Sequence, residues 1–509
     1  MMAMQFPNLD PVVCEMAEMA LAWLDRYWDA EVGLLKMEAE QDEDSTTTPV
    51  PLVHHIRETI WYALGLLQRQ AEGDYERALQ AIQTVLSYQF DEPGKPYDGT
   101  WYRLSEEPHP SEDARIWRDY DPNWREFIGS TLVIILLDYE ANLPPELVMG
   151  IERALRRAMR GALVRRLPAS YTNIALMHAF LLDFTGHRFN DPDWQSRGEA
   201  YAREIYQLFE PNHAFAEFNA PTYYGVDLYA LGLWRRYSFS SLLQRLGSDM
   251  EASLWRDVAL MYHAGMKNMA GPFDRAYGMD MQSYASLIGL WIWMATAKEC
   301  APFPDVTRPF AHQHDFAFVP CYIGVGISVP DDVLPHLRSF QCERQVVRTI
   351  TNRPHRVAHA WIGQHILLGG EETEYNKPAS GQFHPATIQW VGEQGRICWI
   401  RLVYHTNIVI NARAEKNMIT CNIMGVDGDH PDIFFRIFMP DGSRHSLQQD
   451  RWQLSGLTVD VDTRATFDCA IQATPTSGGA YYDVRYTTGD IVPDTTIYFA
   501  LTTRDVADS

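Results

Sequence analysis

The chain has 509 residues, too many for one ordinary hydrophobic core, so we expect two or three domains. Hydrophobic residues make up 46% of it and charged residues 21%, which is normal for a globular protein. The formal net charge of -23 argues against binding to nucleic acid or to a membrane surface, and against long polyanions as substrates unless the cleft is locally basic.

The N-terminal segment has neither a basic start nor a long apolar run, so we expect no secretory signal. No apolar run elsewhere approaches the length of a membrane span. The seven Cys residues are scattered without CxxC pairs, a pattern typical of reduced thiols. These features predict a cytoplasmic protein, and they leave open whether it forms a homo-oligomer.

Apolar residues recur at helical spacing through the first 300 residues, and clusters of Pro, Gly and Asp separate the segments. Helices in successive antiparallel pairs favour an α/α toroid, an incomplete barrel of helical hairpins. Residues 41–51, acidic and then rich in Thr and Pro, are expected to form a surface loop. The expected helices are 11–28, 52–70, 75–90, 124–141, 145–164, 171–184, 192–209, 222–246, 250–267 and 282–298.

The pattern changes after Pro302, where short β-rich runs begin to alternate with turns. Such runs are typical of an antiparallel β-sandwich. The expected strands are 322–329, 345–350, 357–368, 397–403, 408–411, 433–439 and 496–501. The sequence therefore predicts a multidomain α + β protein, with a catalytic toroid over residues 1–300, a linker over 301–315 and a sandwich over 316–509.

The segment from Glu217 to Leu228 places two phenols, Tyr223 and Tyr224, in the expected first turn of a helix. A helix start has unpaired N–H groups and a partial positive charge, which favour an anionic group. Together with Glu217 and Asn219, these phenols suit proton abstraction beside a sugar carboxylate. One of the two is expected to be part of the core, and Tyr224 is slightly favoured as the reactive one.

Two further segments carry candidate binding groups. Asn173 opens the helix expected at 171–184 and either binds a substrate carboxylate or caps that helix. The loop 271–280, bounded by Gly, supplies Asp274, Arg275 and Tyr277. Arg275 can pair with a carboxylate through two hydrogen bonds, and Tyr277 can stack or transfer a proton. The alternative is a structured turn with an internal Asp–Arg pair.

A sugar subsite is expected around a third group of residues. Trp101 offers a stacking face and Arg118 a partner for a carboxylate, beside Asn123 and Trp124. Trp is highly buried on average, so a structural role for about half of this group is the competing interpretation.

The order of toroid and sandwich resembles the heparinase II/III-like and alginate-lyase-like polysaccharide lyases. Residues 170–174 (SYTNI) resemble the family segment whose Asn neutralises the substrate carboxylate. Residues 217–228 resemble the family helix that carries the catalytic Tyr, and residues 121–129 (DPNWREFIG) resemble the Asn-Trp entry to an earlier helix. Ile174 stands where those families commonly have His.

This resemblance implies a lyase that cleaves a uronate-containing glycan by β-elimination. It implies that Asn173 neutralises the carboxylate and that Tyr224 or Tyr223 transfers the proton. It also implies that His365 or His384 reaches the cleft from the sandwich, as a His often does in these lyases.

We expect no cofactor. Four histidines at two short spacings, His312 with His314 and His355 with His359, invite a metal interpretation. There is no thiolate set and no tight ligand spacing, which argues against it. A structural zinc ion, which the resemblance implies for some relatives, or a calcium ion is the alternative.

Two other functions compete with the lyase. A glycoside hydrolase would use paired carboxylates across a cleft, and the candidates are Glu217, Asp227, Asp274 and Asp280. A non-catalytic carbohydrate-binding protein would use the aromatic residues, which make up 12% of the chain. In all three cases the expected partner is a carbohydrate, a uronate-containing oligosaccharide for the lyase.

Overall fold

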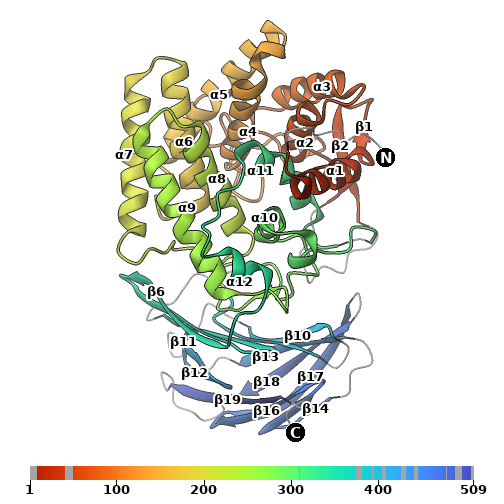
Figure 1. The fold of residues 1–509 in the computed structure, drawn as a ribbon, viewed down its shortest axis with the longest axis vertical. Coiled ribbons are helices and arrows are strands. Elements are labelled where there is room, and N and C mark those ends of the chain that lie inside the picture. Colours follow the sequence, from red (N-terminus) through yellow and green to blue (C-terminus); the bar gives the residue numbers. More distant parts are fainter. Residues whose placement is uncertain are drawn as a thin grey trace.

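The computed structural model describes residues 9–39, 50–308, 310–373, 381–392, 395–403, 408–425, 432–440, 445–476, 479–487 and 496–505. Helices fill the first part of the chain and a large antiparallel sheet fills the rest (Figure 1). The predicted fold class, helical hairpins followed by an antiparallel β-sandwich, is confirmed. The predicted surface loop 41–51 lies, apart from its last two residues, outside the described ranges.

Short connections join the helices into hairpins, as is usual for antiparallel neighbours. The paired helices are α2 with α3, α4 with α5, α6 with α7, and α8 with α9. The helices are α1 Pro11–Asp25, α2 Ile56–Arg69, α3 Asp74–Ser87, α4 Trp124–Tyr139, α5 Pro145–Arg165, α6 Thr172–Arg188, α7 Pro192–Phe209, α8 Tyr223–Tyr237, α9 Ser241–Met261, α10 Leu287–Ala295, α11 Val319–Val325 and α12 Leu334–Arg338, with the 3-10 helices η1 Glu140–Asn142, η2 Lys298–Cys300 and η3 Gln313–Phe318.

Each hairpin has an inner and an outer helix. The inner helix α6 is buried on all sides from Thr172 to Gly186, whereas the outer helix α7 buries only one stripe of small and apolar residues. The inner helices α2, α4, α6 and α8 contact one another in that order, and α10 contacts α8. Because every hairpin returns the chain to its starting end, the N-termini of the inner helices gather at one end of the ring.

The sandwich is a 14-stranded antiparallel sheet, within the described residues, that encloses a second apolar core. The strand order is β14-β15-β16-β19-β12-β11-β8-β9-β10-β13-β18-β17, and β7 joins β6 to β8. Buried residues alternate with partly or fully exposed residues along β11 and β16, as expected where one face of a strand covers a core.

The strands of this sheet are β6 Arg344–Asn352, β7 His355–Ile362, β8 Ile366–Thr373, β9 Ala386–Val391, β10 Ile397–Leu402, β11 Ile408–Glu415, β12 Met418–Gly425, β13 Ile433–Pro440, β14 Ser446–Leu447, β15 Arg451–Leu454, β16 Leu457–Thr463, β17 Thr466–Thr476, β18 Gly479–Thr487 and β19 Ile497–Asp505. Two small sheets accompany the helices, formed by β1 Trp28–Asp29, β2 Leu34–Glu38 and β3 Leu52–His55, and by β4 Tyr262–His263 and β5 Asn268–Met269.

The strand predicted at 322–329 was wrong, because helix α11 covers residues 319–325. Pro320 stands in the first turn of α11, where its missing N–H loses no hydrogen bond. The helix contacts α2 and α8, and η3 contacts α2, so residues 313–325 belong to the helical core. Of the β-branched residues that suggested a strand here, Val325 is buried in the core of the toroid, and Ile323, Ile327 and Val329 pack against that core while partly exposed.

Two other predicted elements are divided in the structure. The helix predicted at 222–246 ends at Tyr237, and α9 begins at Ser241. In the break the buried carboxylate of Asp183 accepts a hydrogen bond from the backbone N–H of Phe239, at 2.7 Å. The strand predicted at 357–368 is two strands, β7 and β8, joined by a turn over residues 363–365.

A loop of the helical part, residues 271–278, lies directly on the sandwich. Phe273 and His384 exchange two backbone hydrogen bonds, of 3.1 and 2.9 Å, as in an antiparallel sheet. Gly369 of β8 packs so closely on this loop that a Cβ atom there would lie 2.0 Å from the carbonyl carbon of Gly271. The end of the toroid at which the inner helices begin therefore faces the sheet. In the described part of the chain, no helix combines the length and the apolar character needed to cross a membrane.

Candidate active site

A cavity of about 230 Å³ lies where the inner helices begin. Its wall includes a residue at or beside the start of each of α2, α4, α6, α8 and α10: Arg57, Asn123, Asn173, Tyr223 and Leu287. Unpaired N–H groups and partial positive charges of several helix starts therefore converge on one space. This arrangement favours an anionic ligand although the protein as a whole is acidic.

Tyr223 is the centre of a hydrogen-bonded cluster in this wall. Its hydroxyl accepts a hydrogen bond from Nη2 of Arg275 and lies 2.8 Å from the hydroxyl of Tyr277. The guanidinium carbon of Arg275 also lies 3.6 Å from the centre of the Tyr223 ring. One cation thus contacts both the oxygen and the face of this phenol, and it stabilises the phenolate form.

Burial raises the pKa of Tyr223 well above 10, and the neighbouring Tyr277 raises it further, whereas Arg275 lowers it. The phenol therefore carries its proton at neutral pH in the ligand-free protein. In that state it can protonate a leaving oxygen. It can accept a proton only after it has lost its own, and Arg275 favours that loss.

Glu217 connects the two other donors of the site. Nδ2 of Asn173 donates to one carboxylate oxygen at 2.8 Å, and Nη1 of Arg275 donates to the other at 2.7 Å. Nε of Arg275 donates to Oε1 of Gln382, which the sandwich side contributes, at 2.9 Å. Asn173 and Arg275, which both line the cavity, are thus already directed at a carboxylate.

Tyr224, the phenol that the sequence slightly favoured, lies elsewhere. It is 0% exposed, its ring packs against Phe218 with centroids 6.4 Å apart, and it is not part of the cavity wall. Successive residues of a helix point about 100° apart, so α8 directs Tyr223 into the cavity and Tyr224 into the core. The structure therefore gives Tyr224 no route to a substrate.

Neither predicted sandwich histidine lines the cavity. His384 is buried, and its Nε2 lies 3.1 Å from the carbonyl oxygen of Ala276. Burial and the charge of Arg401 lower the pKa of His384 well below 6.5, so its ring is neutral. It therefore contacts the loop 271–278 from the sandwich side and does not line the cavity.

His365 is exposed in the turn between β7 and β8, and it belongs to a different cavity of about 360 Å³ on the sandwich. The sequence had placed it in the middle of a strand. The sandwich side instead contributes Gln382 to the site, a residue that no sequence pattern marked.

The predicted sugar subsite is only partly assembled. Asn123 and Trp124 line the cavity, and Nδ2 of Asn123 donates to the hydroxyl of Tyr171 at 3.1 Å. Trp101 is fully buried in the core, so it has no face for a sugar. Arg118 is exposed and pairs with Asp119 at 2.6 Å, outside the cavity wall.

Asn219 and Asp274 hold the loop and do not face the cavity. The amide of buried Asn219 donates to the carbonyl oxygens of residues 270 and 272, both at 2.7 Å. Asp274 pairs with Arg356 of β7, whose Nε donates to Glu371 at 2.8 Å. The sequence offered an internal pair of Asp274 with Arg275 as one alternative, whereas in the structure Asp274 pairs with Arg356 and Arg275 pairs with Glu217.

Several residues of the wall were missed by sequence reasoning: Arg57, Trp117, Asp121, Tyr171 and Asp315. Trp117 is 48% exposed and offers an aromatic face, and burial raises the pKa of Asp121 to about 6. Asp121 and Tyr171 lie inside the segments 121–129 and 170–174 that the sequence singled out, but only their neighbours Asn123 and Asn173 were named as site residues. Arg57, Trp117 and Asp315 come from distant segments, and no local pattern marks them.

Two of the four histidines considered for a metal site, His312 and His359, make other contacts. The His312 ring stacks on Tyr277 at 3.9 Å, and Nε2 of His359 lies 2.9 Å from Glu372. Among the residues that the structure describes, there is no group of three or more His, Cys, Asp or Glu side chains that could hold a metal ion.

Fold and site together define a toroid-and-sandwich protein with a phenol–guanidinium cluster at the gathered helix starts. The chain belongs to the family of the domain of unknown function DUF8769, whose model matches residues 14–325. A second domain of unknown function, DUF8770, matches residues 340–488. No curated protein matches the sequence.

Two solved structures are similar to the chain at a distance. One is a mutant of the heparan sulfate lyase HepC from Pedobacter heparinus, at 11% identity and a TM-score of 0.37, with 99% of this chain and 84% of that chain covered. The other is a heparinase III gene product, at 8% identity and a TM-score of 0.38, with 99% and 85% covered.

Proposed function

We propose that the protein is a lyase that cleaves a uronate-containing oligosaccharide by β-elimination, with Tyr223 as the proton-transfer residue. The supporting observation is the contact of the Tyr223 hydroxyl with Arg275 and Tyr277, in the same cavity wall as Asn173. A phenol next to a fixed cation and a second phenol is suited to moving a proton beside a bound anion.

Uronate β-elimination needs a donor that neutralises the carboxylate, a base for the C5 proton and an acid for the leaving oxygen. In this proposal Asn173 and Arg275 bind the carboxylate. Tyr223, as the phenolate, takes the C5 proton; the C4–O bond breaks, and a C4–C5 double bond forms. The proton then reaches the leaving oxygen from Tyr223 or, through the 2.8 Å contact, from Tyr277.

The small cavity and the net charge of -23 both favour a short oligosaccharide over a long polyanion. Trp117 supplies a face for a sugar ring. The guanidinium carbon of Arg57 lies 4.3 Å from the centre of the Trp124 ring, and Arg57 also pairs with Glu58 at 2.5 Å. The partial positive charges at the helix starts favour the binding of one or a few carboxylates, although the protein as a whole is acidic.

The test is a panel of uronate oligosaccharides followed by ultraviolet absorbance of the conjugated C4–C5 double bond. We expect absorbance to appear with wild type and to be lost in Tyr223→Phe. New reducing ends without this absorbance would contradict the lyase and support hydrolysis. Binding without either signal would support a carbohydrate-binding protein.

A glycoside hydrolase is the second candidate, because two carboxyl groups, Asp121 and Asp315, line the cavity. Burial raises the pKa of Asp121 to about 6, as is typical of a general acid in glycoside hydrolysis. Among the carboxylates proposed from sequence, Asp227 is fully buried, and Glu217 and Asp274 are held in ion pairs. A hydrolase would therefore use Asp121 as the acid and Asp315 as the base or nucleophile.

A further inference from the structure

Glu217 occupies the place that a ligand carboxylate would take. We propose that Asn173 and Arg275 form a carboxylate-binding site that Glu217 fills in the ligand-free protein and leaves when a uronate carboxylate binds. The uronate as ligand rests on the proposed function, whereas the site itself rests on geometry alone.

The first argument is the completeness of the contact. Each carboxylate oxygen of Glu217 has one donor, at 2.8 Å from Asn173 and 2.7 Å from Arg275, which are distances of strong hydrogen bonds to an anion. One amide and one guanidinium on two oxygens would hold a sugar carboxylate equally well. A bound uronate would therefore exchange one carboxylate for another without leaving a buried donor unpaired.

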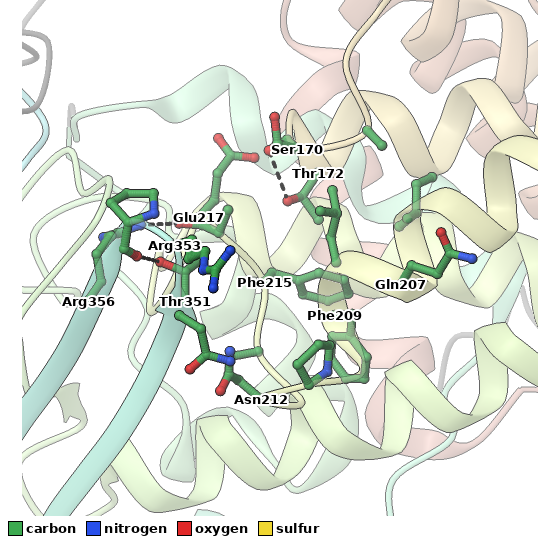
Figure 2. A pocket seen from close by; sticks show the side chains of 18 of the residues that line it. Ser170, Thr172, Gln207, Phe209, Asn212, Phe215, Glu217, Thr351, Arg353 and Arg356 are labelled. Carbon is green, nitrogen blue, oxygen red and sulfur yellow. Dashed lines mark hydrogen bonds between the residues drawn. The ribbon is translucent and has the colours of Figure 1, made fainter.

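The second argument is the position of Glu217 between two spaces. Asn173 and Arg275 line the 230 Å³ cavity, but Glu217 does not. Glu217 lines a neighbouring cavity of about 520 Å³, formed by the end of α7, residues 211–217 and the β6–β7 turn (Figure 2). The Glu217 side chain thus reaches the two donors from the 520 Å³ cavity, whereas the donors themselves line the 230 Å³ cavity.

The third argument is that the larger cavity can receive the displaced side chain. Figure 2 shows Glu217, Ser170 and Arg353 among the side chains around it. Arg353 is exposed, and within the described parts of the chain its side chain makes no hydrogen bond or ion pair. A displaced carboxylate would need a polar partner, and the free guanidinium of Arg353 provides one.

Glu217 would then act as a specificity-determining residue. A neutral sugar cannot replace a carboxylate between an amide and a cation, so it leaves Glu217 in place. A uronate can replace it, but its apparent affinity is reduced by the small fraction of protein in which the site is open. Removing Glu217 should therefore tighten the binding of carboxylates and not of neutral sugars.

The experiment measures binding of D-glucuronate, with D-glucose as the neutral probe, to the full-length protein by calorimetry. We expect Glu217→Ala to bind glucuronate at least about tenfold more tightly than wild type, as expected when a competing closed state is removed. Glu217→Gln keeps the size and removes the charge, so it should show the same direction with a smaller gain. Glucose binding should not change in either variant.

The matched control is Glu251→Ala, which removes another buried carboxylate that accepts from an Arg, at 2.7 Å from Arg235. It should leave glucuronate affinity unchanged. The double variant Glu217→Ala with Asn173→Ala should lose the gain. The proposal is overturned if Glu217→Ala and Glu217→Gln bind glucuronate no more tightly than wild type, or if the double variant keeps the gain.

The outcomes separate this proposal from the lyase. A gain in glucuronate affinity with no elimination by wild type on any uronate oligosaccharide keeps the carboxylate site and removes the lyase. Elimination by wild type with no gain in the Glu217 variants keeps the lyase and removes this role of Glu217.

Discussion

Replacing Tyr223 with Phe removes one oxygen atom and keeps the ring. The lost hydroxyl is the acceptor for Arg275 and the 2.8 Å partner of Tyr277, whereas the contact of the Arg275 cation with the ring, at 3.6 Å, remains. A hydrogen bond from a charged donor contributes about 1.5–3 kcal/mol, so we expect the free energy of unfolding to fall by about that amount. Elimination should fall about a hundredfold or more, the usual effect of losing a general acid or base.

The assay compares the rate of absorbance increase for both proteins on the same oligosaccharide, with urea unfolding as the measure of stability. Tyr224→Phe is the matched control, because that phenol lies in the core and should leave the elimination rate near wild type. If Tyr223→Phe keeps the wild-type rate, or if Tyr224→Phe alone loses it, the assignment of Tyr223 is refuted.

Three further predictions concern pH, burial and the support of the loop. Because burial holds the pKa of Tyr223 well above 10, the phenolate fraction and the elimination rate should rise about tenfold per pH unit across the neutral range. Arg275 lowers this pKa, so Arg275→Gln should move the rise to higher pH. An elimination rate that does not change with pH would contradict a phenolate base. The pKa of Asp121, raised from 3.8 to about 6, means that the folded state binds its proton more tightly than the unfolded state, so stability falls as pH rises between these values by up to about 3 kcal/mol. Asp121→Asn should therefore be more stable than wild type in urea at pH 7 but not near pH 4. If the variant and the wild type are equally stable at both pH values, burial does not disfavour the charged form of this carboxyl group. Arg356→Met removes the cation that pairs with two buried carboxylates, Asp274 and Glu371, and should lower the free energy of unfolding by about 3–5 kcal/mol. Arg413→Met removes an exposed pair and should change it by less than about 0.5 kcal/mol, and similar losses in both variants would contradict this account.

The sequence located the inner helices well because they are long, apolar and bounded by turn residues. The helix expected at 171–184 is α6, Thr172–Arg188. Asn173 and Tyr223 could be proposed from sequence because each stands at a helix start, and the hairpin topology brings such starts together. The loop that carries Arg275 and Tyr277 could be proposed because it is short, polar and bounded by Gly.

Helix rotation could not be predicted. Whether Tyr223 or Tyr224 faces the cavity depends on how α8 is turned, and close packing sets that turn. A Cβ atom on Gly225 would lie 2.4 Å from the Cβ of Leu287, so this face of α8 is held directly against the start of α10. Apolar periodicity shows that α8 is buried, but a helix buried on nearly all sides leaves little periodicity to fix its phase.

The two sandwich histidines, His365 and His384, show that contacts between distant segments could not be predicted from the sequence. His384 is paired through its backbone with Phe273, a residue more than a hundred positions earlier, and nothing local encodes that pairing. For His365 the error was one of element boundaries, because the expected strand 357–368 hid the turn in which this residue lies.

The attachment of the loop 271–278 to the sandwich has a consequence for how such proteins can be recombined. The loop comes from the helical part, yet the backbone N–H groups of Phe273 and Ala276 donate to the carbonyl oxygens of residues 384 and 382. Because Gly369 has no side chain, the backbone of the loop can pack directly on strand β8. A toroid fused to a foreign sandwich would keep its helices but lose the surface on which its reactive arginine is mounted. The two parts are therefore expected to be inherited, and to be transplanted in engineering, as one unit.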